Sequence, residues 1–268
     1  MPTLFYAHGN YLKHPGAMKA FWKVYQKMRC CPGPKRLVCW SWPAQRVYGG
    51  LRIRKMILDN LRIKVVYAEY QGYYLARLLQ QMSLSQRVTL TGHSYGAIVA
   101  STAAHWLGGG QLRGLTLAGG APVERPNLRI GLISGAFDND ALLPGYRYGQ
   151  AMVAVEKAFI TRNIRDRTLK IWKKTSHRGC LAIGVTGLNA RRLGKFSDKL
   201  CQITMTSDVR TSHYLEPHLN SARMMSMLCC LAFPQCQVSM PLAEEASPAK
   251  KAARTAENQP PRLPSSES

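Results

Sequence analysis

The chain has 268 residues, of which 46% are hydrophobic, and its 37 Lys and Arg against 14 Asp and Glu give a formal charge of +23. This length and composition predict one globular domain with a large core and exclude a mainly disordered chain. The longest apolar run, Met227 to Phe233, is too short to span a bilayer. The first residues lack the basic start and long apolar middle of a signal peptide, so we expect a cytoplasmic protein.

The basic excess belongs to the folded part, because the residues after Pro241 carry equal numbers of basic and acidic side chains. Their Pro, Ala, Ser, Glu and Lys content predicts a disordered tail over 241–268, after a domain of residues 1–240. A field of this sign could attract nucleic acid, anionic lipid or anionic substrates. However, the basic residues cluster only in pairs, such as Lys173-Lys174 and Arg191-Arg192. We therefore expect a solvated basic surface and no specific nucleic-acid partner.

The first third of the chain alternates predicted strands and helices. Thr3 to Ala7 reads as a strand that ends in His8-Gly9-Asn10, and residues 16–28 read as a helix stopped by Pro32-Gly33-Pro34. A second predicted strand covers Arg36 to Trp42 and ends in Ser41-Trp42-Pro43. Apolar residues at four-residue steps predict a long amphipathic helix: Val66, Tyr70, Tyr74, Leu78 and Met82.

The stretch Gly92-His93-Ser94-Tyr95-Gly96 carries the strongest chemical signal. It follows a predicted strand, Val88 to Thr91, and precedes a predicted helix from Ala97 through Leu107. A strand that enters a helix through so tight a turn leaves the serine hydroxyl exposed, and a side chain at either flanking glycine would collide with neighbouring backbone. The pattern predicts a nucleophilic Ser94; an ordinary turn serine is the alternative.

Beyond this turn the alternation continues with one interruption. Predicted strands cover Arg113 to Leu117, Ala158 to Arg162 and Lys199 to Thr206, and a helix opens at Tyr214 and runs through Leu228. This order predicts an α/β fold with a mostly parallel sheet and helices on both faces.

Residues 123–157 break the rhythm and read as a small helical cap over Ser94, with an ordinary helical connection as the alternative. The cap lining would be Ile130, Leu132, Ile133, Phe137 and Leu142, of which we assign Phe137 and Leu142 to substrate binding. Asp138-Asn-Asp140 lacks the further ligands of a calcium loop, and the chain has no C-x-x-C, so we expect no metal site.

These landmarks resemble the α/β-hydrolase superfamily over most of residues 1–233, most closely its small bacterial hydrolases of unassigned substrate. The resemblance implies a minimal sheet, because the leading antiparallel strands have no room before Thr3. It also implies an oxyanion hole made by the backbone N–H groups of Asn10 and Tyr95. No cofactor is implied.

The superfamily's order of serine, acid and histidine implies the remaining members of a catalytic triad. His213 follows the last predicted strand and is preferred over His105, His177 and His218. Asp166 follows the penultimate strand and is preferred over the other acids between Ser94 and His213, which are Glu124, Asp138, Asp140, Glu156, Asp198 and Asp208.

Together these features predict a serine hydrolase that cleaves a carboxylic ester, or a related acyl bond of a small molecule, through an acyl-enzyme. Two alternatives stay open. One is a non-catalytic binding protein with the same fold, and the other is a basic scaffold that binds nucleic acid or a membrane surface.

Overall fold

The computed structural model describes residues 1–46, 54–82, 85–119, 127–176 and 178–233, so the predicted tail 241–268 lies outside the described residues. One six-stranded sheet has the order β2-β1-β3-β4-β5-β6, with every neighbouring pair parallel. The strands are β1 (Thr3–Ala7), β2 (Arg36–Trp40), β3 (Arg87–His93), β4 (Asn127–Ile133), β5 (Lys157–Arg162) and β6 (Leu200–Thr204).

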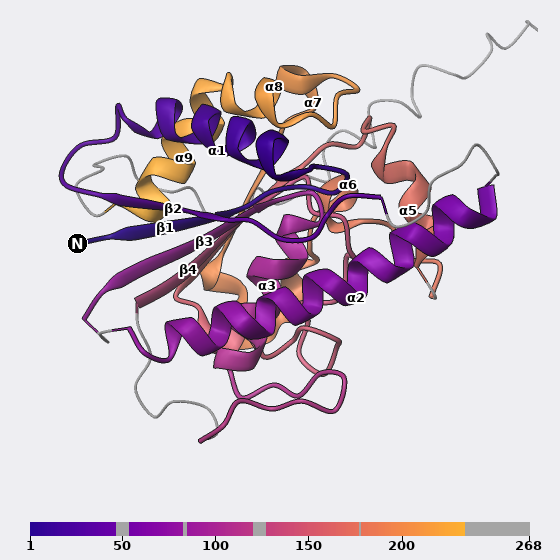
Figure 1. Cartoon of the computed structure of the whole chain (residues 1–268), viewed down its shortest axis with the longest axis horizontal. Helices are drawn as coiled ribbons and strands as arrows, with labels where there is room; N and C mark the ends of the chain where they lie inside the picture. Colours follow the sequence, from indigo (N-terminus) through magenta and orange to yellow (C-terminus); the bar gives the residue numbers. More distant parts are fainter. Residues whose placement is uncertain (47–53, 83–84, 120–126, 177, 234–268) are drawn as a thin grey trace, which may run out of the picture.

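Helices cover both faces of the sheet (Figure 1). One face carries α1 (His14–Met28), α8 (Leu215–Leu219) and α9 (Ala222–Ala232), and the other carries α2 (Arg54–Leu79) and α3 (Gly96–Leu107). The shorter elements are α4 (Ala151–Ala154), η1 (Leu169–Ile171), α5 (Trp172–Thr175), α6 (Ile183–Thr186), η2 (Ala190–Lys199) and α7 (Thr206–Val209). The parallel sheet with helices on both faces is the α/β class of fold that the sequence predicts. No described helix combines the length and hydropathy that a membrane-spanning segment requires.

The sheet has a hydrophobic core on each face, because successive side chains of a buried parallel strand point to opposite faces. In β1, Leu4 and Tyr6 pack on the face of α1 and α9, whereas Phe5 and Ala7 pack on the face of α2 and α3. All five residues of β1 are buried, because this strand lies between β2 and β3 inside the sheet.

Helix α2 is longer than predicted and packs through a different face. The predicted apolar stripe is largely solvent-facing, with Tyr74 52% and Leu78 42% exposed. Small residues at four-residue steps, Ala68, Gly72 and Ala76, are buried instead. A Cβ added at Gly72 would lie 1.9 Å from Thr102 Oγ1 of α3. The close approach of two helix backbones therefore selects small residues, and the large ones point outward.

The middle of the chain requires two corrections. Arg113 to Leu117 is not a strand; it forms turns with an isolated bridge between Leu112 and Leu115. The strand beside β3 is β4, so residues 127–133 of the predicted cap belong to the sheet, and Ile130, Leu132 and Ile133 are core residues there. Gly131 suits its place in this strand, because a Cβ there would lie only 3.1 Å from Thr91 Oγ1 of β3.

The predicted C-terminal helix is also divided. It forms α8 and α9, separated at Asn220 and Ser221, and the Ser221 hydroxyl accepts a hydrogen bond from the Met224 N–H at the start of α9. A serine in this capping position begins a new helix.

We predict that Gly72→Ala lowers the free energy of unfolding by about 1–3 kcal/mol, because the new methyl group overfills the contact between α2 and α3. Gly16→Ala in α1 is the matched control, since the nearest atom to its Cβ is 3.4 Å away. The control should be neutral or stabilising by up to about 1 kcal/mol. Urea unfolding of both variants measures the difference, and equal stabilities would contradict the packing account.

Candidate active site

The turn between β3 and α3 has the geometry that its glycines predict. Ser94 has φ 55, a left-handed conformation that is rare for a residue with a side chain. A Cβ at Gly92 would lie 2.1 Å from the backbone of Gly96, and a Cβ at Gly96 would lie 2.1 Å from the carbonyl oxygen of Ala7. The Ser94 N–H donates to the Ile133 carbonyl over 2.9 Å, which fastens the turn to the end of β4.

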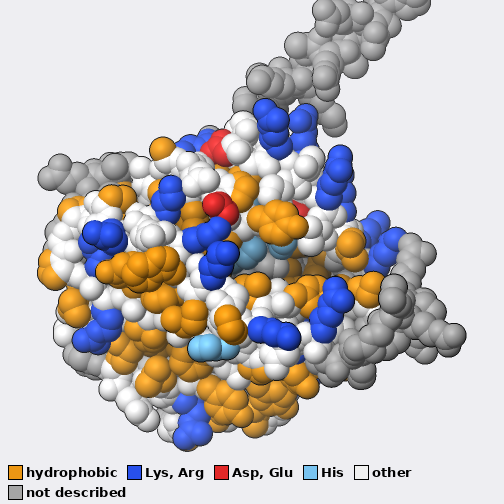
Figure 2. All heavy atoms as spheres, turned by 45° about the horizontal axis from the view of Figure 1, so that its top comes forward, with side chains coloured by type: hydrophobic (Ala, Val, Ile, Leu, Met, Phe, Trp, Pro, Cys, Tyr) orange, Lys and Arg blue, Asp and Glu red, His pale blue; other side chains and the backbone are white. Residues whose placement is uncertain are grey.

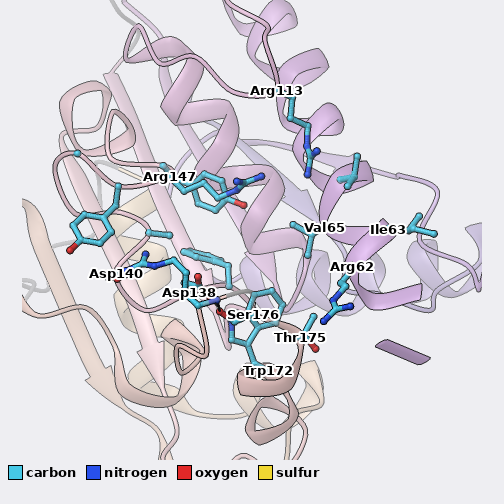
Figure 3. Close-up of a pocket in the computed structure, with 17 residues that line it drawn as sticks. Arg62, Ile63, Val65, Arg113, Asp138, Asp140, Arg147, Trp172, Thr175 and Ser176 are labelled. Atoms are coloured by element: carbon cyan, nitrogen blue, oxygen red, sulfur yellow. Dashed lines mark hydrogen bonds and ion pairs between the residues drawn. The ribbon is translucent and has the colours of Figure 1, made fainter. Parts of the chain in front are cut away.

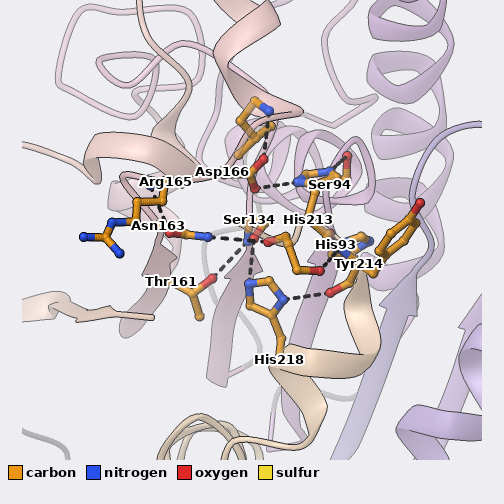
Figure 4. Close-up of polar contacts among 12 residues, drawn as sticks. His93, Ser94, Ser134, Thr161, Asn163, Arg165, Asp166, His213, Tyr214 and His218 are labelled. Atoms are coloured by element: carbon orange, nitrogen blue, oxygen red, sulfur yellow. Dashed lines mark hydrogen bonds and ion pairs between the residues drawn. The ribbon is translucent and has the colours of Figure 1, made fainter. Parts of the chain in front are cut away.

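Three predicted site residues meet at this turn (Figure 4). His213 Nε2 lies 2.9 Å from Ser94 Oγ, and His213 Nδ1 lies 2.8 Å from Asp166 Oδ2. Asp166 is fully buried, and its other oxygen accepts the Leu169 N–H over 2.9 Å. An imidazole that donates from Nδ1 to a carboxylate presents its Nε2 as an acceptor for the serine hydroxyl.

Two further histidines, which the sequence interpretation did not assign to the site, hold the loop of His213. His93 Nε2 lies 2.8 Å from the His213 carbonyl oxygen, and His218 Nδ1 lies 2.9 Å from the Tyr214 carbonyl oxygen. Both ring nitrogens donate there, because a carbonyl oxygen only accepts. Burial lowers the pKa of both rings, that of His93 well below its ordinary value.

The second nitrogen of His218 completes a buried link between the sheet and α8. His218 Nε2 lies 2.8 Å from Ser134 Oγ, and the Ser134 N–H donates to Thr161 Oγ1 over 2.9 Å. Ser134 follows β4 with φ 46, and Thr161 belongs to β5. His218 is fully buried. No local sequence pattern links Ser134 to a residue 84 positions away.

The predicted oxyanion-hole residues lie on either side of Ser94. Tyr95 follows it in the turn, and Asn10 follows Gly9, whose added Cβ would lie 3.4 Å from Ser94 Cβ. Trp42 fastens this loop, since its backbone N–H donates to His8 Nε2 over 3.1 Å and its Nε1–H donates to the His8 carbonyl over 2.8 Å. Both side-chain polar atoms of Asn10 are shielded from solvent and lack a hydrogen-bond partner among the described residues.

A cavity of about 840 Å³ lies between α2 and the segments that follow β4 and β5 (Figure 3). Phe137, one of the two predicted substrate-binding residues, is in its wall together with Tyr148 and Trp172. The Trp172 ring contacts the ring of Tyr95 edge to face, with centroids 6.0 Å apart, so this wall adjoins the turn of Ser94. Leu142, the other predicted residue, is fully buried in the core and does not line this cavity.

Asp138 and Asp140 of the predicted cap are already paired. Asp138, Asp140 and Cys180 lie close enough to share a cation, with ligand atoms within 4.8 Å. However, Arg178 donates to both oxygens of Asp140 over 3.1 and 2.7 Å, and Trp172 Nε1 donates to Asp138 over 2.8 Å. A metal ion would have to displace the guanidinium.

The residues that we set aside lie elsewhere. His105 is buried in α3, with its Nε2 3.3 Å from the Gln111 carbonyl oxygen, and His177 is outside the described residues. Asp208 accepts hydrogen bonds from Ser207 and Ser221, which lower its pKa. It shapes the loop before His213.

No family model matches the sequence, and no curated protein matches it. Solved structures align over most of the chain at low identity. Zea mays acyl-protein thioesterase 2 is 13% identical, with 85% of this chain and 91% of that chain covered and a TM-score of 0.47. Esterase PE8 is 12% identical, with coverages of 85% and 90% and a TM-score of 0.44. Esterase B from Lactobacillus rhamnosis is 11% identical, with coverages of 96% and 80% and a TM-score of 0.43.

The buried histidines predict a loss of stability in acid. Burial lowers the folded-state pKa of His8, His93, His105 and His218, so below the ordinary value of about 6.5 the unfolded chain binds more protons than the folded chain. The contribution of these neutral histidines to the free energy of unfolding is complete above pH ~6.5 and is lost as the pH falls below that value. Denaturant unfolding between pH 5 and 8 measures the slope. In His218→Gln the slope of the free energy of unfolding against pH should decrease by at most about 1.4 kcal/mol per pH unit. A slope steeper than that of the wild type would contradict a neutral His218.

Proposed function

We propose that this chain is a serine hydrolase that cleaves carboxylic esters, or related acyl bonds, of small molecules. The observation that supports the proposal is the pair of hydrogen bonds through His213, 2.9 Å to Ser94 Oγ and 2.8 Å to Asp166 Oδ2. It supports nucleophilic catalysis because Ser94 is itself the left-handed residue of the turn. The His213 ring beside it is only slightly exposed, and the Asp166 carboxylate on the other side of that ring is fully buried.

In this proposal Ser94 Oγ attacks the carbonyl carbon of the substrate while His213 Nε2 takes the hydroxyl proton. The Asp166 carboxylate accepts the His213 Nδ1–H throughout and stabilises the imidazolium that forms. His213 then returns the proton to the leaving oxygen as the acyl–oxygen bond breaks. Water, deprotonated by the same nitrogen, cleaves the acyl-enzyme and restores Ser94.

The oxyanion would be bound by the backbone N–H groups of Asn10 and Tyr95, at the loop after β1 and at the start of α3. The side-chain amide of Asn10, which has no hydrogen-bond partner among the described residues, gives this assignment additional support. A shielded amide without partners is costly, and a polar ligand beside Ser94 would satisfy it. Phe137 and Trp172 would provide an apolar surface near the turn, which favours an uncharged acyl or leaving group over a peptide.

The nucleophile is tested with a fluorophosphonate probe. We expect it to label Ser94, and we expect Ser94→Ala to lose labelling and to reduce hydrolysis of short-chain esters by up to about a millionfold. The position of the label is read by peptide mass spectrometry. Labelling of the Ser94→Ala chain at an unchanged rate would refute the assignment. A folded wild-type chain that neither reacts nor hydrolyses any ester would favour the non-catalytic alternative.

The acid is tested by Asp166→Asn, which keeps the shape of the side chain and an oxygen for the Leu169 N–H. The amide would favour the wrong tautomer of His213, so the rate constant for ester hydrolysis should fall by about four orders of magnitude. Asp208→Asn is the control, since Asp208 bonds serines of its own loop, and it should keep nearly full activity. The reverse result would move the acid to Asp208 and leave Ser94 and His213 in place.

A further inference from the structure

The segment after β5 separates buried from exposed residues with a three-residue period. Asp166, Leu169, Trp172 and Thr175 are buried, at 0, 3, 8 and 3% exposed. The other charged and large apolar side chains of residues 164–174 are exposed: Ile164, Arg165, Arg167, Lys170, Ile171, Lys173 and Lys174. The segment therefore packs inward through one stripe and presents five cations and two isoleucines to solvent.

These cations differ from the arginines of the cavity wall. Arg113 and Arg147 are paired with the buried Glu69, and Arg178 is paired with Asp140. Within the part of the chain that the structure describes, none of the five cations of residues 164–174 lies within 4 Å of a carboxylate. The segment's own acid, Asp166, is fully buried against His213. Five like charges on eleven residues thus lack an anionic partner.

The segment lies beside the loop that carries His213. The Asn163 amide donates to the Arg210 carbonyl over 2.9 Å, and the Arg167 N–H donates to the Thr211 carbonyl over 3.5 Å. Tyr214, directly after His213, is 80% exposed, and Ile164, two residues before Asp166, is 61% exposed. Figure 4 shows Arg165 directed away from the cluster of Ser94, His213 and Asp166. Large apolar and basic side chains therefore share the edge of the candidate active site.

Figure 2 shows a face of the molecule on which hydrophobic side chains lie between Lys and Arg side chains, with few Asp or Glu and with His side chains in a hollow. We name the exposed residues of 164–174, together with Tyr214, the basic rim. We propose that the basic rim docks this protein on an anionic lipid surface. The phosphates and carboxylates of the lipid headgroups would pair with the five cations, and the isoleucines and Tyr214 would enter the interfacial region.

A lipid surface fits this combination better than nucleic acid does. Phosphate contacts would satisfy the lysines and arginines in both cases, but nucleic-acid binding gains little from aliphatic side chains that stand free of the fold. Ile171 is 48% exposed in the middle of the cations, where only an apolar phase would remove it from water. Docking would bring Tyr214, directly after His213, against the lipid; that the lipid then supplies an amphiphilic ester rests on the proposed function.

Docking is tested with the full chain and sedimented vesicles of phosphatidylcholine, with or without phosphatidylserine. Binding should require phosphatidylserine and weaken with salt. Lys170→Glu/Lys173→Glu/Lys174→Glu should weaken it by about a hundredfold or more, at about fivefold or more for each reversed charge. The control, Arg29→Glu/Arg36→Glu/Arg77→Glu, makes the same change in net charge at exposed positions near the amino ends of the strands, whereas the basic rim follows the carboxyl end of β5. It should change binding only a few-fold.

A second variant tests the apolar part. Ile164→Ser/Ile171→Ser should weaken vesicle binding by about tenfold and leave its salt dependence unchanged. Circular dichroism establishes that each variant is folded. Equal losses in the rim and control variants would overturn the proposal. Duplex DNA bound as tightly as the vesicles, with no effect of the isoleucine changes, would also overturn it in favour of a general polyanion site. Since no assay depends on turnover, failure of ester hydrolysis would leave this result intact.

Discussion

The close approach of three backbone segments at residues 92–96 is the constraint on which the site depends. Any side chain at Gly92 would overlap Gly96, and any side chain at Gly96 would overlap the end of β1 at a distance of 2.1 Å. The same turn receives the Ile133 carbonyl from β4, so three neighbouring strands end at one point. The surrounding backbone holds Ser94 in its left-handed conformation, so within this turn the strained φ falls on the residue that carries the hydroxyl.

The loop of His213 is positioned by groups whose protonation state is fixed by burial. His93 and His218 each use a ring N–H to bind a carbonyl oxygen of this loop, at His213 and at Tyr214. Burial lowers the pKa of both rings, so each remains a neutral imidazole with one donor and one acceptor. For His218 the acceptor nitrogen meets Ser134, which ties α8 to the ends of β4 and β5. These bonds hold the backbone at His213 and Tyr214, from which the His213 side chain reaches Ser94 and Asp166.

The sequence indicated Ser94 through its local pattern, and Asp166 and His213 through the residue order of the superfamily that it resembles. Ser94 lies in a glycine-flanked turn between a strand and a helix, and Asp166 and His213 follow the last two strands. It failed where tertiary packing overrides local preference. Arg113 to Leu117 contains Gly114, whose φ of +74 belongs to a turn, whereas Gly131 of residues 127–133 lies where a Cβ would be 3.1 Å from Thr91 Oγ1 of β3. Likewise α2 packs through Ala68 and Gly72, because helix spacing favours small residues over tyrosines.

Charge is distributed differently inside the protein and on its surface, and this bears on the net charge of +23. Glu69 is fully buried and is bound by Arg113, Arg147 and the Tyr148 hydroxyl, as a buried carboxylate requires. The carboxylates of the core and the cavity wall are thus satisfied by the chain itself. The excess cations lie on the surface, where their mutual repulsion opposes folding and stabilises no interaction within the monomer. An unpaired basic rim beside a candidate active site is therefore better explained by something it binds than by anything it stabilises.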